Sequence, residues 1–146
     1  MLALASDHGG FALKQEIMAY LKESGIEYED LGTYSTESVD YPVYAAKLGR
    51  AVAAGEYERG ILLCGTGIGI SIAANKIKGI RCALCTDCYS AEMSRRHNDA
   101  NVLALGGRTM GVEVARKIVD IFLRTPFEGG RHQRRVDLIM ALESEQ

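Results

Sequence analysis

The chain has 146 residues, of which 47% are hydrophobic and 25% charged, with a net charge of -2 and a pI near 5.9. This composition is typical of a globular protein, and we expect a single domain over residues 1–146. The weak negative charge argues against nucleic-acid binding, and no apolar run approaches the length of about 20 residues that spans a bilayer. Four cysteines and an N-terminus without a secretory pattern predict free thiols and a cytoplasmic location.

The first half of the chain alternates short apolar runs with amphipathic stretches. The pattern predicts strands at 2–5, 28–31 and 59–64. It predicts a first helix that ends at Gly25, in which Leu13, Ile17, Tyr20 and Leu21 recur at helical spacing, and further helices from 42 to 54 and from 67 to 76.

The second half continues the alternation. Strands are expected at 81–85 and 101–106, with a short helix at 89–96 between them. A further helix has its buried face at Ala115, Ile118, Val119 and Phe122. The last helix, 131–143, is expected to bury Val136, Ile139 and Met140.

This alternation predicts an α/β fold: a doubly wound, Rossmann-like parallel sheet of five strands with helices on both faces, in a three-layer sandwich. Ligands of such sheets bind beyond the carboxyl ends of the strands. We therefore expect a site among the polar residues that follow the predicted strands, namely Asp7, His8, Cys64 and its loop, Thr86, Asp87 and Arg108.

The stretch CGTGIGIS at residues 64–71 lies between a predicted strand and a predicted helix. It lacks the last glycine of a dinucleotide fingerprint and the Gly-Lys-Ser/Thr of a P-loop. Its glycines allow a sharp turn, and the unpaired amides of the next helix suit a phosphate or a transient oxyanion. The same helix dipole would favour the thiolate of Cys64. A tight structural turn around a buried cysteine is the alternative.

Two further stretches carry basic residues and histidines. GGRHQRR at 129–135 places Arg131 and Arg135 four residues apart on one helical face, a spacing that can grip a phosphate, with His132 adjacent. RRHNDAN at 95–101 places His97 and Asn98 at a helix end just before a strand. A solvated basic turn and a structural histidine are the alternatives.

The run CALCTDC contains Cys82, Cys85 and Cys88 at the spacing of an iron–sulfur motif. The fourth ligand position of that motif would fall at Glu92, and the first two cysteines lie in a predicted strand. We therefore expect no metal site there.

Five segments taken together resemble ribose-5-phosphate isomerase type B: SDHGG (6–10), SVDYP (38–42), CGTGIGISIAANK (64–76), SRRHNDANVLALGGR (94–108) and GGRHQRRV (129–136). The same group includes the galactose-6-phosphate isomerase subunits, and the resemblance covers essentially the whole chain. It implies interconversion of ribose 5-phosphate and ribulose 5-phosphate, a step of the pentose phosphate pathway. The implied intermediate is a cis-enediol(ate), and no metal or other cofactor is implied.

The resemblance also implies residue roles. Cys64 is the base that moves a proton between C1 and C2, since the glutamate of another branch is replaced here by Ile70. Thr66 handles the hydroxyl proton, and His97, with Asp7 nearby, opens the sugar ring. The substrate and its phosphate would be held by His8, Tyr41, Gly65, Gly67, Ile68, Gly69, Ser71, Asn98, Arg108, Arg131, His132 and Arg135.

Family members are dimers or larger, so a homodimer or homotetramer with its site between subunits is implied. The helix from about 131 is expected to contribute to the dimer interface. The sequence leaves open a preference for a hexose 6-phosphate, such as allose or galactose 6-phosphate. A non-catalytic sugar-phosphate-binding module and a thiol redox protein are the rival classes.

Overall fold

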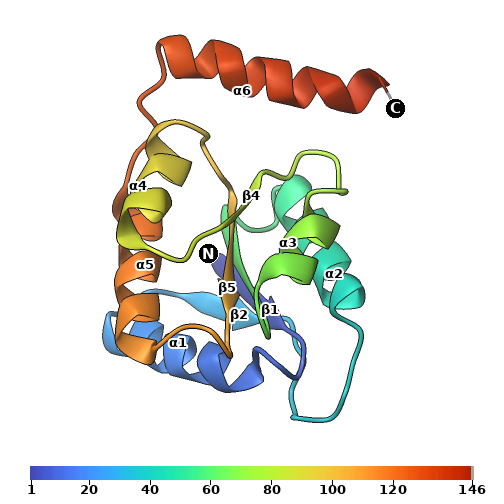
Figure 1. Cartoon of the computed structure of the whole chain (residues 1–146), viewed down its shortest axis with the longest axis vertical. Helices are drawn as coiled ribbons and strands as arrows, with labels where there is room; N and C mark the ends of the chain where they lie inside the picture. Colours follow the sequence, from blue (N-terminus) through green and yellow to red (C-terminus); the bar gives the residue numbers. More distant parts are fainter. Residues whose placement is uncertain (146) are drawn as a thin grey trace.

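The computed structural model describes residues 1–145, in which strands and helices alternate (Figure 1). All five strands run parallel, in the order β2-β1-β3-β5-β4, so the predicted fold class is confirmed. The strands are β1 (Leu2–Ser6), β2 (Tyr28–Asp30), β3 (Arg59–Cys64), β4 (Cys82–Leu84) and β5 (Val102–Gly106). The helices are α1 (Phe11–Glu23), α2 (Tyr41–Ala53), α3 (Ile68–Ala74), α4 (Cys88–Arg96), α5 (Val112–Arg124) and α6 (Arg131–Ala141), and a 3-10 turn follows at Leu142–Glu145.

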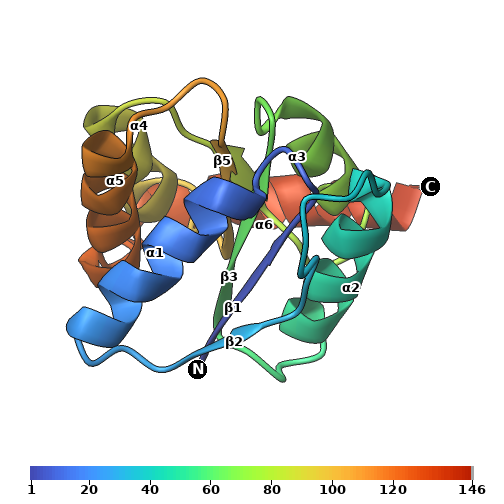
Figure 2. The same ribbon diagram turned by 90° about the horizontal axis from the view of Figure 1, so that it is seen from below.

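The three layers follow from the alternation of side chains along each strand. Leu2 and Leu4 of β1 belong to one buried cluster, whereas Ala3 and Ala5 belong to a second cluster on the other face. α1, α4 and α5 contribute to the first cluster and α2 and α3 to the second, and Figure 2 shows the two groups on either side of the sheet. Because both faces are covered, the strands read as continuous apolar runs.

A fully buried lysine ties α1 to the segment after β2. Lys14 Nζ donates to Asp30 Oδ1 at 2.5 Å and to the Thr33 carbonyl at 2.6 Å. Burial lowers the pKa of Lys14, and Asp30 acts in the opposite direction. The pair fixes the start of the loop between β2 and α2 against the carboxyl end of the sheet.

β4 is shorter than predicted and only half-buried, because it lies at an edge of the sheet. The side chain of Asn75 occupies the outer side of this strand. Its Nδ2 donates to the Cys82 carbonyl at 2.9 Å, and its Oδ1 accepts from the Cys82 amide at 2.8 Å. The carboxamide thus replaces the neighbouring strand that an edge lacks.

α6 belongs to neither helical layer and lies across the end of the sheet where the strands begin (Figure 1). Arg81, the residue before β4, donates from Nη1 to Met140 Sδ at 3.2 Å. The prediction of a helix from Arg131 is confirmed, but its predicted buried stripe is met only at Val136, since Met140 is half-buried and Ile139 is exposed. Val136 is buried whereas Ile139 is 43% exposed, because α6 crosses the sheet's end instead of packing along a face. No helix within residues 1–145 is long and apolar enough to span a bilayer.

Candidate active site

The carboxyl ends of β1 and β3 form the first part of the candidate site. These two strands are neighbours, with Ser6 paired to Leu63, yet the chain continues from β1 to β2 on one side and from β3 to β4 on the other. Such a switch point opens a crevice where ligands of doubly wound sheets bind. Asp7 and Cys64 stand at this point, directly after or at the end of their strands.

Asp7 and His8 are fixed by backbone amides. The buried Asp7 accepts from Gly9 N at 2.8 Å and Gly10 N at 3.1 Å through Oδ1, which holds its carboxylate at the start of α1. His8 Nδ1 accepts from Val39 N at 3.2 Å. This bond leaves Nε2 of His8 as the nitrogen that can donate, and it joins the loop before α2 to the site.

The glycine loop directs a backbone amide at the sulfur of Cys64. Gly67 N donates to Cys64 Sγ at 3.1 Å, and the cysteine is 5% exposed. Gly67 has a φ of 80°, and a Cβ there would meet Leu84 Cδ1 at 2.6 Å and the Leu105 carbonyl carbon at 2.9 Å. Only glycine fits both the backbone and the space, so the turn that aims this amide depends on it.

Other predicted residues gather around the same loop. The exposed Thr66 accepts from Ile68 N through Oγ1 at 3.2 Å. A Cβ on Gly69 would lie 2.6 Å from Tyr41 Cζ, so the Tyr41 ring lies against the loop. Arg108 N donates to the Gly65 carbonyl at 2.9 Å. We call Asp7, His8, Tyr41, Cys64, Thr66 and Arg108 the carboxyl-edge group.

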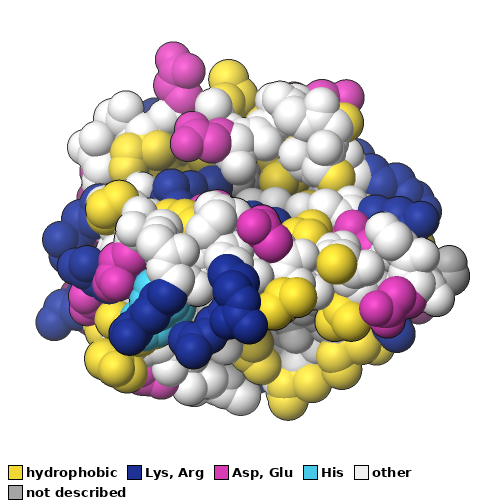
Figure 3. Space-filling view, turned by 90° about the horizontal axis from the view of Figure 1, so that it is seen from above, with side chains coloured by type: hydrophobic (Ala, Val, Ile, Leu, Met, Phe, Trp, Pro, Cys, Tyr) yellow, Lys and Arg dark blue, Asp and Glu magenta, His cyan; other side chains and the backbone are white. Residues whose placement is uncertain are grey.

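The predicted residues Ile68 and Ser71 lie in α3, directly after this loop, but five other predicted residues lie elsewhere. His97 is the C-cap of α4 and His132 belongs to the first turn of α6, and their rings stack with centroids 4.1 Å apart. Burial lowers the pKa of His132, and the neighbouring His97 and Arg131 act in the same direction. Viewed from above, where α6 covers the sheet, lysines and arginines gather beside a histidine (Figure 3). We call His97, Asn98, Arg131, His132 and Arg135 the amino-edge group.

The two groups lie at opposite ends of the sheet. His97 precedes β5 and Arg108 follows it, and a five-residue strand at about 3.3 Å per residue separates them by roughly 15 Å. Figure 1 shows α6 at the top of the sheet and the connection from β1 to α1 at the bottom. The expectation of His97 near Asp7 is therefore not met within one chain. The reason is topological, since a helix that precedes a parallel strand ends where that strand begins.

Two further sequence features have local structural effects. Asp87 caps α4 by accepting from Ser90 N at 2.7 Å, and this bond holds the pKa of its carboxyl below the usual value. Burial raises the pKa of Cys82 to about 12 and that of Cys85 to about 11. Thiols so weakly acidic are poor redox nucleophiles, which argues against a redox pair formed by Cys82 and Cys85.

Glu128 is a neighbour of the amino-edge group that the sequence patterns do not indicate. Its Oε1 lies 3.5 Å from His132 Nε2, four residues on. That spacing is the available signal, but Glu128 precedes α6, so helical periodicity does not reveal it.

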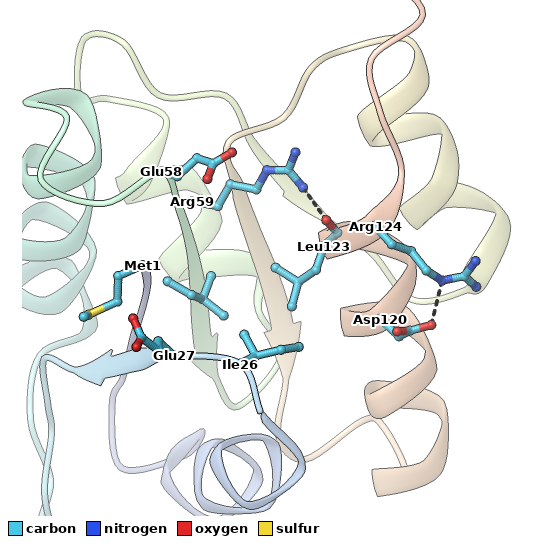
Figure 4. A pocket seen from close by; sticks show the side chains of 9 residues that line it. Met1, Ile26, Glu27, Glu58, Arg59, Asp120, Leu123 and Arg124 are labelled. Atoms are coloured by element: carbon cyan, nitrogen blue, oxygen red, sulfur yellow. Dashed lines mark hydrogen bonds and ion pairs between the residues drawn. The ribbon is translucent and has the colours of Figure 1, made fainter. Parts of the chain in front are cut away.

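A cavity of about 530 Å³ lies apart from every predicted site residue (Figure 4). The side chain of Arg59 lines part of this cavity, and its Nη1 donates to the Leu123 carbonyl at 3.0 Å. A second cavity of about 410 Å³ lies between α6 and β4 and includes Asn98 in its wall. The lining of the first cavity is Met1, Leu2, Ile26, Glu27, Glu58, Arg59, Asp120, Leu123 and Arg124.

Comparison with known proteins assigns the family. The model of the Ribose/Galactose Isomerase family matches residues 2–139. Ribose-5-phosphate isomerase B of Escherichia coli is 56% identical over 97% of this chain and 95% of its own length. The structure of the Clostridium thermocellum ribose-5-phosphate isomerase B superposes with a TM-score of 0.97 at 54% identity, covering 99% of this chain and 97% of that one.

The ribose-5-phosphate isomerase B of Mycoplasma genitalium, solved with bound ribulose-5-phosphate, is 42% identical. It gives a TM-score of 0.94 and covers 99% of this chain and 97% of its own. These similarities extend over both the carboxyl-edge and the amino-edge groups. The chain therefore belongs to the ribose/galactose isomerase family, as its sequence motifs predict, and is an isomerase.

Proposed function

We propose that this chain interconverts ribose 5-phosphate and ribulose 5-phosphate, in a site assembled from two copies of the chain. The observation that carries the proposal is the placement of Cys64, a buried thiol at the switch point with the Gly67 amide directed at its sulfur. The related Mycoplasma genitalium protein, whose structure holds ribulose-5-phosphate, supports a pentose 5-phosphate as the substrate.

Cys64 acts as the base. In the open-chain aldose its thiolate takes the proton from C2, the C–H electrons form the C1=C2 bond, and the carbonyl oxygen becomes an enediolate oxygen. Return of the proton to C1 gives the ketose, while Thr66 moves a proton between the two oxygens. The amides at the start of α3 hold the oxyanion, a role in which each donor contributes about 3–4 kcal/mol in other enzymes.

The amino-edge group of a second copy completes the site. His97 opens the sugar ring, and Arg131 and Arg135 hold the phosphate, assisted by His8 and Arg108 from the first copy. Phosphate binding far from the reacting carbons supplies the energy that positions C1 and C2 against the base.

Two observations support this assembly. The groups cannot meet within one chain, because the sheet separates them. Both α3 and α6 also carry exposed apolar side chains, with Ile72 58% and Leu138 55% exposed. A two-fold pair that brings the carboxyl edge of each copy to the amino edge of the other would form two sites and cover such residues.

The test compares kcat/KM for ribose 5-phosphate, allose 6-phosphate and galactose 6-phosphate in the purified protein. We expect the pentose to be preferred, and a clear preference for a hexose phosphate would overturn the assignment. Cys64→Ala should lose kcat far more than substrate affinity. A non-catalytic binding module would instead leave the C1 and C2 protons unexchanged in deuterated water.

A further inference from the structure

Three side chains able to ligate a metal converge where α4 ends and α6 begins. The ligand atoms of His97, Glu128 and His132 all lie within 4.8 Å of one another. His132 is buried, His97 is half-buried and Glu128 is exposed, so the cluster opens to solvent on the carboxylate side. An ion can enter from that side without unfolding the helices.

Backbone hydrogen bonds hold each of the three residues in place. His97 N donates to the Met93 carbonyl at 2.9 Å, and His132 N donates to the Gly129 carbonyl at 3.0 Å. Glu128 N donates to the Arg96 carbonyl at 3.1 Å, which attaches the segment before α6 to the end of α4. Only side-chain rotations are then needed to bring the ligands to one ion.

The carboxylate is oriented toward the imidazoles. Arg96 Nη1 lies 3.7 Å from Glu128 Oε2, and His132 Nε2 lies 3.5 Å from Oε1. The two rings stack with an angle of 10° between their planes, so at least one ring has to turn for both nitrogens to face a common ion. Ligands of tetrahedral zinc stand about 3.3 Å apart, so the required closure is roughly 1.5 Å.

We propose that His97, Glu128 and His132 bind a divalent transition-metal ion of the zinc class, and that this ion inhibits the isomerase. Two imidazole nitrogens and one carboxylate oxygen form a three-ligand zinc set that leaves one coordination position open. Arg96, Arg131 and Arg135 place positive charge around the cluster, so the ion exchanges readily instead of serving as a structural metal.

The binding follows from the cluster alone, whereas the inhibition rests on the function proposed above. A metal on His97 occupies the nitrogen that would move a proton in ring opening. The bound ion also adds a positive charge, with one open coordination position, at the place where the phosphate would be held. Zinc should therefore compete with the sugar phosphate.

Cobalt(II) is the probe that separates this cluster from the thiols. Titrated into chelator-treated protein, it should give visible d–d bands at one ion per chain, without the near-ultraviolet band of thiolate ligation. Cys64→Ser should keep the spectrum, and Glu128→Gln should lose it. A spectrum that shows thiolate ligation and disappears in Cys64→Ser would overturn the proposal, as would the absence of cobalt binding to wild-type protein.

Glu128→Gln also tests the inhibition, because Glu128 has no role in the proposed reaction. The variant should keep wild-type turnover in metal-free buffer and need at least tenfold more zinc for half-inhibition, because loss of even an outer-shell partner weakens metal binding about 10- to 100-fold. Glu113→Gln, which changes a carboxylate 88% exposed on α5, is the matched control and should keep wild-type sensitivity.

The outcomes distinguish the two proposals. Equal zinc sensitivity of Glu128→Gln and wild type would refute inhibition through this cluster. Cobalt binding at the cluster without any effect of zinc on turnover would keep the metal site and reject the role of His97 in the reaction. A protein inactive on all three sugar phosphates would reject the proposed function, and the cobalt spectrum would still decide the metal site.

Discussion

Mixing two inactive variants tests whether the site is shared between copies. Cys64→Ala removes the proposed base at the carboxyl edge, and His97→Ala removes the proposed ring-opening group at the amino edge. Loss of a positioned acid or base costs about 100-fold or more in rate, so each variant alone should be nearly inactive. In the proposed two-fold pair each site takes Cys64 from one chain and His97 from the other.

The geometry sets the expected recovery. A mixed pair contains one intact site and one site lacking both groups. Joint refolding at equal amounts gives about half mixed pairs, so about a quarter of the wild-type turnover per chain should return. The assay is ribulose 5-phosphate formation after refolding, with native mass spectrometry to show that mixed pairs have formed.

A matched mixture supplies the control. Cys64 and Thr66 belong to the same loop of one chain, so Cys64→Ala mixed with Thr66→Ala leaves every site defective. That mixture should stay inactive. Recovery there, or none in the first mixture although mixed pairs have formed, would refute the shared site.

Three other predictions concern single features. Cys82, whose pKa is raised to about 12 by burial, stays protonated at pH 8 and should resist alkylation until far more alkaline pH, as peptide mapping by mass spectrometry would reveal. Gly67→Ala should lower the free energy of unfolding by about 2–3 kcal/mol, against about 1 kcal/mol for Gly25→Ala, since both have positive φ but only Gly67 is crowded. Lys14→Met should lower the free energy of unfolding, measured in urea, by about 3 kcal/mol, because Asp30 loses its ion-pair partner. The double variant Lys14→Met/Asp30→Asn should regain part of this stability. If the effects of the two substitutions simply added, the coupling between the two side chains would be contradicted.

The layers of the sheet were predictable because both faces of each strand are covered. β3 reads as an uninterrupted apolar run ending in Cys64, and that run placed the thiol at the correct end of the sheet. The buried face of α5 was predicted equally well, since Ala115, Ile118, Val119 and Phe122 are all buried. Strong periodicity was enough to predict the buried residues wherever the element that covers them belongs to the same chain.

The buried residues of the last helix were predicted less well, for a physical reason. Helical spacing identifies which side of α6 is apolar, but it does not say what covers that side. Val136 is covered by this chain, whereas Ile139 is 43% exposed in it. The stacking of His97 on His132 was also beyond sequence patterns, because it depends on the path of the segment from Thr125 to Gly130.

The side chain of Asn75 has a consequence for how copies of this protein can associate. An open edge strand can recruit a strand from another molecule, and that pairing leads to extended sheets and aggregates. Here the amide and carbonyl of Cys82 are already bonded to the Asn75 carboxamide, and β2 at the opposite edge has only three residues. Contacts between copies are thereby directed to helices and loops, where assemblies close instead of growing into fibres.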